Sequence, residues 1–101
     1  MIDSDPEMVK AFLRATAKGY ADVIADPDAA AEVLYDHASD YDLEMLKKSQ
    51  EYLAEKFMED TDTWGMMKDE VWDNYSAFRQ EYGVISEALP AADCYTNEFL
   101  Q

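Results

Sequence analysis

The sequence predicts an all-α chain with four main helices, a short C-terminal turn and a tail. Apolar residues recur in four segments with the spacing that places them on one face of a helix. Three of these segments begin near an aspartate suited to capping a helix, and the fourth is followed by a glycine. No segment of five or more residues alternates cleanly between apolar and polar side chains, so no strand is expected.

The first two helices begin with the same arrangement: an aspartate N-cap, a proline at the first helical position and a second acidic residue. The two sequences are "DPE" at positions 5–7 and "DPD" at positions 26–28. The second acid of each stretch faces the positive end of the helix dipole. We therefore expect a first helix from about Pro6 to Ile24, and a shorter, alanine-rich second helix that ends near Ala38.

The third helix is expected from about Asp42 to Phe57, with either Asp40 or Asp42 as its N-cap. Its leucines at positions 43, 46 and 53 share one side, and charged residues occupy the other. The stretch "MEDTDTWGMM" then breaks the helical period. Thr-Asp-Thr disfavours a helix, and Gly65 permits a turn that other residues resist.

The fourth helix is expected from about Lys68 to Tyr82, and Gly83 follows where a left-handed C-terminal cap belongs. A further helical turn is expected around residues 91–94. The tail beyond it carries three large apolar side chains, which is unusual for an exposed terminus and suggests a surface to pack against. These side chains are Tyr95, Phe99 and Leu100.

The composition indicates one helical unit that spans residues 1–101 without an internal boundary. The 101 residues are 49% hydrophobic and 31% charged, which suits one small domain. The net charge of −15 would repel phosphate groups, so nucleic acid and membrane surfaces are not expected partners. A single cysteine, Cys94, excludes an internal disulfide, and the first residues, "MIDSDPEM", lack the features of a signal peptide.

No catalytic residue, metal ligand or cofactor is assigned from the sequence. His37 is the only histidine and has no cysteine near it, so neither a zinc site nor a Cys/His nucleophile pair can be assembled locally. Asp60, Asp62 and Gly65 match three positions of a calcium-binding EF-hand loop. The match fails because Trp64 and Val71 occupy positions that need oxygen ligands.

Trp64 is the one candidate ligand-binding residue. It adjoins Gly65, Met66 and Met67, and an indole beside adaptable methionines can form a wall against a flat ligand. Packing in the core is the alternative role for this side chain.

Lys10, Arg14 and Lys18 recur at every fourth position and would line one strip of the first helix. The strip either pairs with acids such as Glu7 and Asp22 in solvent or forms a docking surface.

Several blocks together resemble one family, the thiamine-pyrimidine-precursor-type solute-binding proteins of ABC transporters, whose relatives include fungal thiamine-pyrimidine synthases. The blocks are "VKAFLRATAKGYADVIADPDAAAEVL" (Val9–Leu34), "SQEYLAEKF" (Ser49–Phe57), "WGMMKDEVWDNYSAF" (Trp64–Phe78), "YGVI" (Tyr82–Ile85) and "YTNEFL" (Tyr95–Leu100). They cover nearly all of this chain, which corresponds to about the last third of a family member.

The resemblance implies that the chain is a fragment of a two-lobed α/β fold of the periplasmic-binding-protein type 2 class. The full-length parent would be extracellular or periplasmic and membrane-anchored, and it would capture a small aromatic, pyrimidine-like solute for an ABC permease. Tyr95, Phe99 and Leu100 would anchor the terminus on a lobe that lies upstream, and Asn97 would fix the bend before that anchor. The synthase chemistry of the fungal branch depends on segments not present here, so an enzyme is not expected.

The alternative is a stand-alone acidic helical module that binds a protein partner through an apolar face. In either case, surfaces that normally cover a missing lobe or partner would stay exposed in the isolated chain. We therefore expect the isolated chain to self-associate.

Overall fold

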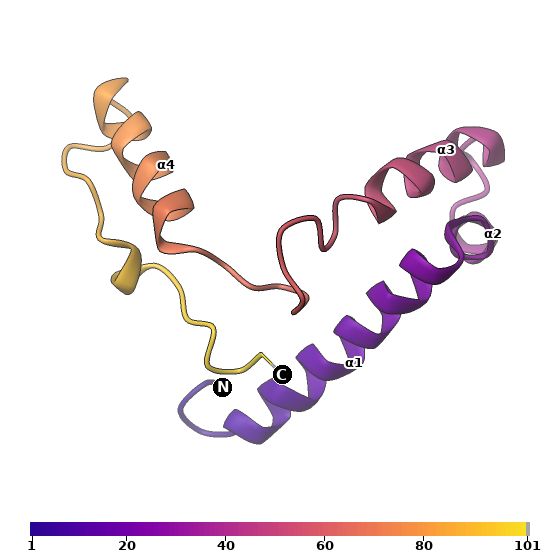
Figure 1. Ribbon diagram of the computed structural model, residues 1–101, viewed down its shortest axis with the longest axis horizontal. Helices are drawn as coiled ribbons and strands as arrows, with labels where there is room; N and C mark the ends of the chain where they lie inside the picture. The colour runs from indigo at the N-terminus through magenta and orange to yellow at the C-terminus, as the bar shows by residue number, and fades with distance from the viewer. Residues whose placement is uncertain (101) are drawn as a thin grey trace. The chain divides into compact units, whose positions relative to one another are not determined.

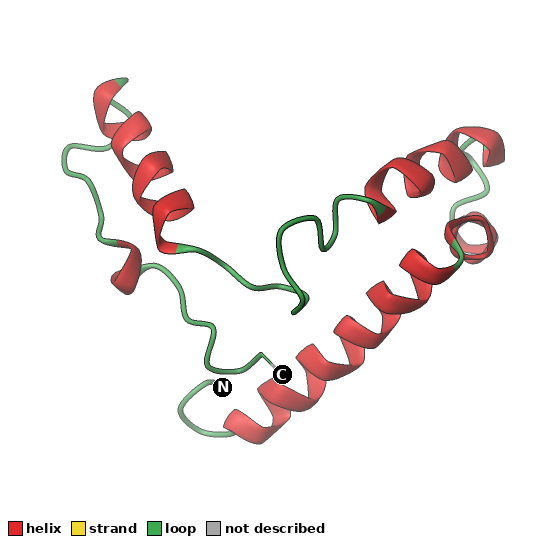
Figure 2. Ribbon diagram, in the orientation of Figure 1, coloured by secondary structure: helices red, strands yellow, loops and turns green. Residues whose placement is uncertain are grey.

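The computed structural model describes residues 1–100. In chain order the helices are α1 (Pro6–Ala25), α2 (Pro27–His37), α3 (Leu43–Ala54) and α4 (Asp69–Glu81), followed by a short 3-10 turn, η1 (Ala91–Asp93) (Figure 1). Between residues 1 and 100 there is no strand (Figure 2). The all-α prediction is confirmed, and the architecture is consistent with a fragment of a larger fold. Among the described residues, no helix combines the length and apolar character needed to span a membrane.

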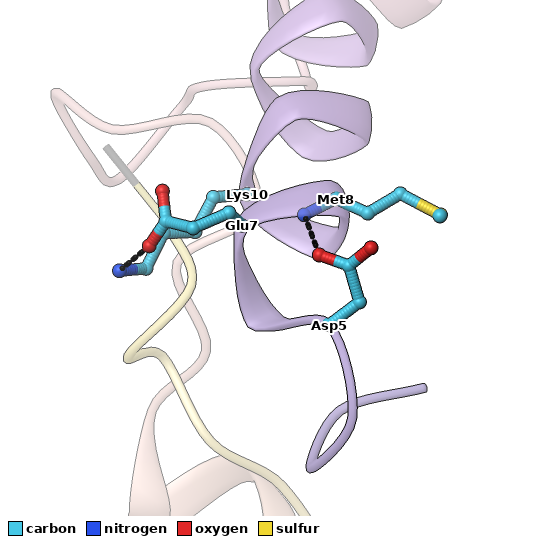
Figure 3. Close-up of polar contacts among 4 residues, drawn as sticks. All are labelled: Asp5, Glu7, Met8 and Lys10. Carbon is cyan, nitrogen blue, oxygen red and sulfur yellow. Dashed lines mark hydrogen bonds and ion pairs between the residues drawn. The ribbon is translucent and has the colours of Figure 1, made fainter.

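The predicted aspartate caps are present at three helix starts. Asp5 accepts a hydrogen bond from the Met8 backbone N–H at 3.0 Å (Figure 3), and Pro6 follows it as the first residue of α1. The other two bonds are from the Ala29 N–H to Asp26 at 3.1 Å and from the Met45 N–H to Asp42 at 2.8 Å. Asp42, not Asp40, is therefore the cap of α3.

The regular part of α3 ends at Ala54, three residues before the predicted end at Phe57. The Lys56 and Phe57 N–H groups both donate to the Leu53 carbonyl, at 2.8 and 3.0 Å. Sharing of one acceptor by two donors is typical of a helix end that tightens into a turn. The chain thus keeps turning up to Phe57 without extending the regular helix.

The described residues form two compact units. The first comprises Met1–Trp64 together with Leu100, and the second comprises Gly65–Phe99. The expectation of a single helical unit without an internal boundary stays a prediction.

In the first unit, α2 packs most extensively on α3 and less extensively on α1. Ala31 of α2 is fully buried, and Leu46 of α3 is also buried. Lys47 of α3 forms an ion pair with Glu32 of α2 at 3.3 Å. The hydrogen bond to Glu32 raises the pKa of Lys47 above its usual value of 10.5, so the lysine stays charged over the physiological range.

The second unit consists of α4 and a returning segment, residues 89–97, which we call the strap. The strap runs antiparallel to the segment from Met67 through α4. Residues that come later in this segment are bonded to residues that come earlier in the strap. The Asp69–Tyr95 bond joins two side chains, and each of the other bonds joins a side chain to a backbone group. The bonded pairs are Met67–Asn97, Asp69–Tyr95, Asp73–Ala91 and Ser76–Leu89.

The C-terminus of α4 is capped by Gly83, as predicted. Its φ is 70°, in the left-handed region that glycine adopts without strain. The Val84 N–H donates to the Arg79 carbonyl at 2.9 Å, and the Gly83 N–H donates to the Gln80 carbonyl at 3.0 Å. This pair of bonds defines a Schellman motif, which ends the helix sharply before the chain turns into the strap.

Few apolar side chains are buried in the described part of the chain. The fully or nearly buried ones are Ala31, Leu46, Ala91 and Phe99. Many large apolar side chains are exposed, among them Phe12, Val33, Tyr52, Tyr75 and Tyr82. So much exposed apolar surface is characteristic of a chain that packs against something else.

Candidate functional site

The predicted ligand-binding residue, Trp64, lies in a cluster of three aromatic side chains in the first unit. Trp64 stacks on Tyr20, with ring centroids 4.8 Å apart and planes inclined by 28°. Phe57 meets Tyr20 edge-on, at 4.7 Å and 86°. We call Tyr20, Phe57 and Trp64 the aromatic cluster. Its geometry combines the offset-stacked and edge-to-face arrangements that aromatic rings prefer.

Each ring of the aromatic cluster is held by local structure. Tyr20 projects from α1, and Phe57 lies in the tightened turn after α3. The Trp64 loop is closed by Thr61, whose hydroxyl accepts from the Thr63 N–H and donates to the Thr63 carbonyl, both at 3.1 Å. Gly65 follows with a φ of 82°, so the predicted glycine turn is confirmed.

An open groove of about 460 Å3 borders the aromatic cluster. Its volume lies within the range of roughly 300–1,000 Å3 that small-molecule sites occupy. Tyr20 and Phe57 contribute aromatic surface to it. The lining residues are Thr16, Gly19, Tyr20, Val23, Gln50 and Phe57.

Two polar side chains give this groove hydrogen-bonding capacity. Gln50 has a side-chain amide that can both donate and accept. The Thr16 hydroxyl donates to the Phe12 carbonyl at 2.9 Å and keeps lone pairs that can accept. Gly19 lies in the wall of the groove, and a Cβ built on it would meet no atom within 4 Å. Aromatic surface beside a few polar groups suits a flat heteroaromatic molecule.

The groove offers little for catalysis or metal binding. Tyr20 is its only titratable lining residue, so it has no acid–base pair. Across residues 1–100, no group of three or more His, Cys, Asp or Glu side chains is arranged to hold a metal ion. The arrangement can bind and orient a ring, and it provides no nucleophile with an adjacent base.

A second groove, of about 550 Å3, lies between α1 and α2. Small residues form most of its wall, and its carboxylates come from Asp22 and Asp26. The Asp26 carboxylate already caps α2. This groove therefore has fewer polar groups available to orient a ligand than the groove beside the aromatic cluster.

The strap accounts for two of the tail residues singled out in the sequence. Tyr95 stacks on Trp72 at 5.5 Å and donates to Asp69 at 2.5 Å, so within the described residues its partners lie on α4. The expected contact of Tyr95 with an upstream lobe stays a prediction. The hydrogen bond to Asp69 raises the pKa of Tyr95 to about 12. Asn97 fixes its bend by accepting from the Met67 N–H at 3.0 Å and donating to the Met67 carbonyl at 2.8 Å.

The basic strip of α1 is paired at its first residue. Lys10 forms an ion pair with Glu7 at 3.0 Å, as expected for a strip that pairs with acids in solvent (Figure 3).

Comparison with known proteins connects the chain with proteins that bind small molecules. The family model described as "NMT1/THI5 like" matches residues 1–30. The riboflavin-binding protein RibY of Chloroflexus aurantiacus is 27% identical over 106 aligned residues, which cover 99% of this chain and 30% of RibY. The chain thus spans less than a third of the length of this curated relative. The similarities support the substrate-binding family that the sequence blocks resemble, and they do not single out a thiamine precursor.

Proposed function

We propose that this chain is the C-terminal segment of an ABC transporter solute-binding protein that captures a small aromatic solute for import. The similarity to RibY, which extends over 99% of the chain, is the observation that carries this proposal. The match of residues 1–30 to the "NMT1/THI5 like" family supports it independently. The corresponding partners are a small-molecule solute and an ABC permease, and the parent protein is extracellular or periplasmic and membrane-anchored.

The proposed solute is a flat heteroaromatic compound. A pyrimidine of the thiamine-precursor type follows from the sequence blocks, and a flavin follows from the similarity to a riboflavin-binding protein. Both present a ring face for stacking and polar ring edges for hydrogen bonds. The aromatic cluster supports this class of solute, because Tyr20 and Phe57 line a groove that also contains Gln50. Trp64 is not among the residues that line this groove, and it stacks on Tyr20.

The proposal describes a binding protein and not an enzyme. Its ligand site requires polar groups that converge from more than one element, and in a two-lobed receptor these groups come from both lobes. The isolated chain is therefore expected to bind no thiamine precursor tightly, whereas the full-length parent binds its solute.

Calorimetry on the full-length parent tests the role of Trp64. Trp64→Ala is expected to weaken binding by about 1–3 kcal/mol if the indole contacts the solute. Trp72→Ala is the matched control, since Trp72 stacks on Tyr95 and belongs to the other unit. Equal affinity of the wild-type and Trp64→Ala proteins would leave the indole a packing role against Tyr20.

The exposed apolar side chains favour a second candidate, a stand-alone acidic helical module that binds a protein. The upstream reading frame separates the two candidates. About two hundred in-frame residues with alternating strand and helix patterns would support the solute-binding protein. A stop codon and a ribosome-binding site before Met1 would support the module.

A further inference from the structure

One face of α4, continued by its C-cap residue Tyr82, carries a regular line of exposed apolar side chains. Val71 is 60% exposed, Tyr75 56%, Phe78 54% and Tyr82 68%. Their spacings of four, three and four residues match the a and d positions of a heptad. We call these four residues the α4 seam. A seam restricted to a and d positions is narrower than the face that a helix usually buries in a globular core, and it is typical of packing against one other helix.

The opposite side of α4 is already occupied by the strap. Ser76 is buried and accepts from the Leu89 N–H at 2.6 Å, and Asp73 accepts from the Ala91 N–H at 3.0 Å. Trp72 lies between this side and the α4 seam, and the stacked ring of Tyr95 covers one face of its indole. The strap therefore fixes α4 from one side, and within the second unit each side chain of the α4 seam stays more than half exposed. The covered part of Tyr75 lies under the Arg79 guanidinium, 5.6 Å from the ring centre, and Tyr75 borders a small hollow with Leu89 and Cys94. A helix fixed in this way loses little further freedom when it binds.

We infer that the α4 seam is a dimerisation surface, which pairs in antiparallel orientation with α4 of a second copy of this chain. In that orientation a positions face d positions. Val71 then lies opposite the partner's Tyr82, and Tyr75 lies opposite the partner's Phe78. Each contact occurs twice because the interface is isologous. The inference does not depend on the proposed solute-binding function.

The charges beside the α4 seam permit this pairing although the chain has a net charge of −15. Trp72 and Arg79 flank the seam on one side, and Asn74 and Glu81 flank it on the other. In the antiparallel pair, Arg79 lies beside the partner's Trp72 and Glu81 lies beside the partner's Asn74. No like charges meet across the seam. Repulsion between more distant carboxylates is screened over about 8 Å at physiological salt.

The area of the α4 seam sets the expected strength of the dimer. An aromatic side chain buries about 200 Å2 when it is fully covered. The three aromatic side chains of the seam are each more than half exposed, so together with Val71 they can bury roughly 450 Å2 per copy. The total of about 900 Å2 is below the roughly 1,200–2,000 Å2 of stable specific interfaces and lies in the range of weak, transient contacts. We therefore expect weak association, with dimers that appear between about 10 μM and 1 mM.

Sedimentation equilibrium of the 101-residue chain over that concentration range tests the inference. Tyr75→Ser and Phe78→Ser should each lower the association constant at least about tenfold, which corresponds to 1.4 kcal/mol. Phe12→Ser on α1 removes an aromatic side chain that is 70% exposed and lies outside the seam, so it should leave the constant unchanged. Circular dichroism checks that each variant keeps its helices.

Disulfide trapping tests the orientation in a Cys94→Ser background. When the single variants Val71→Cys and Tyr82→Cys are mixed and oxidised, the antiparallel pair should give mainly the mixed disulfide. Each variant oxidised alone should give at least about tenfold less dimer. A strictly monomeric chain at 1 mM, loss of association in Phe12→Ser but not in Phe78→Ser, or a preference for like-with-like disulfides would overturn the inference.

Discussion

Replacing Asn97 with alanine should loosen the second unit by a measurable amount. The Asn97 amide is half-buried and makes two hydrogen bonds to one backbone residue, accepting from the Met67 N–H at 3.0 Å and donating to the Met67 carbonyl at 2.8 Å. A hydrogen bond contributes about 0.5–1.5 kcal/mol net. Water can reach these groups after the substitution, so we expect the free energy of unfolding to fall by about 1–2 kcal/mol.

Urea unfolding followed by tryptophan fluorescence measures this change. A Trp64→Phe background leaves Trp72, which stacks on Tyr95 within the second unit, as the only reporter. Glu98→Ala is the matched control, because Glu98 is the exposed next residue and its side chain makes only a long 3.4 Å contact with Thr96. A midpoint in Asn97→Ala equal to that of the control would refute the reasoning that the strap is fixed through Asn97.

Three further predictions concern a helix cap, a titrating tyrosine and cooperativity. Asp26→Ala removes the acceptor for the Ala29 N–H and should lower the free energy of unfolding by about 1 kcal/mol in urea titrations. If Asp36→Ala, a control substitution within α2, lowers the free energy of unfolding by the same amount, the capping role is contradicted. The pKa of Tyr95 is raised from 10.0 to about 12, so its contribution to stability is complete below pH 10 and is lost as the pH rises through 12. Ultraviolet difference absorbance should detect this late ionisation, and a Tyr95→Phe variant that retains the same alkaline loss of stability would exclude Tyr95 as its cause. Variants that retain only Trp64 or only Trp72 each report on one of the two units. If the chain behaves as one helical unit, both variants should unfold at the same urea midpoint, and two separate midpoints would show that the units unfold independently.

Local chemistry explains which parts of the fold could be predicted from the sequence. Asp5 and Asp26 cap their helices because the cap bond reaches only three residues along the chain. Gly83 likewise ends α4 through bonds confined to residues 79–84. The choice between Asp40 and Asp42 required the backbone geometry, because either carboxylate can act as an N-cap.

The strap could not be predicted, because its bonds join residues far apart in sequence. Asn97 and Met67 are separated by 30 positions, and Tyr95 and Asp69 by 26. The resemblance placed Tyr95 against an absent lobe. The structure supplies Trp72 as its partner, since α4 turns this ring toward the returning chain. Aromatic composition alone does not reveal which rings meet.

The candidate site could be predicted only in part, because its three rings come from positions far apart in the sequence. The neighbours Gly65 and Met66 single out Trp64 in the sequence, whereas no neighbouring residue singles out Tyr20 or Phe57. Their convergence on Trp64 arises from tertiary packing in the first unit.

Calorimetric titration of the full-length parent with a small panel of solutes tests the central claim most directly. The panel contains riboflavin, a thiamine-precursor pyrimidine, and a sugar and an aliphatic amino acid as controls without an aromatic ring. The proposed function predicts that at least one heteroaromatic solute binds with a dissociation constant below about 10 μM and that neither control binds at that concentration. Binding of a control solute in preference to both heteroaromatic compounds, or the absence of any solute binding by a folded parent, would contradict it.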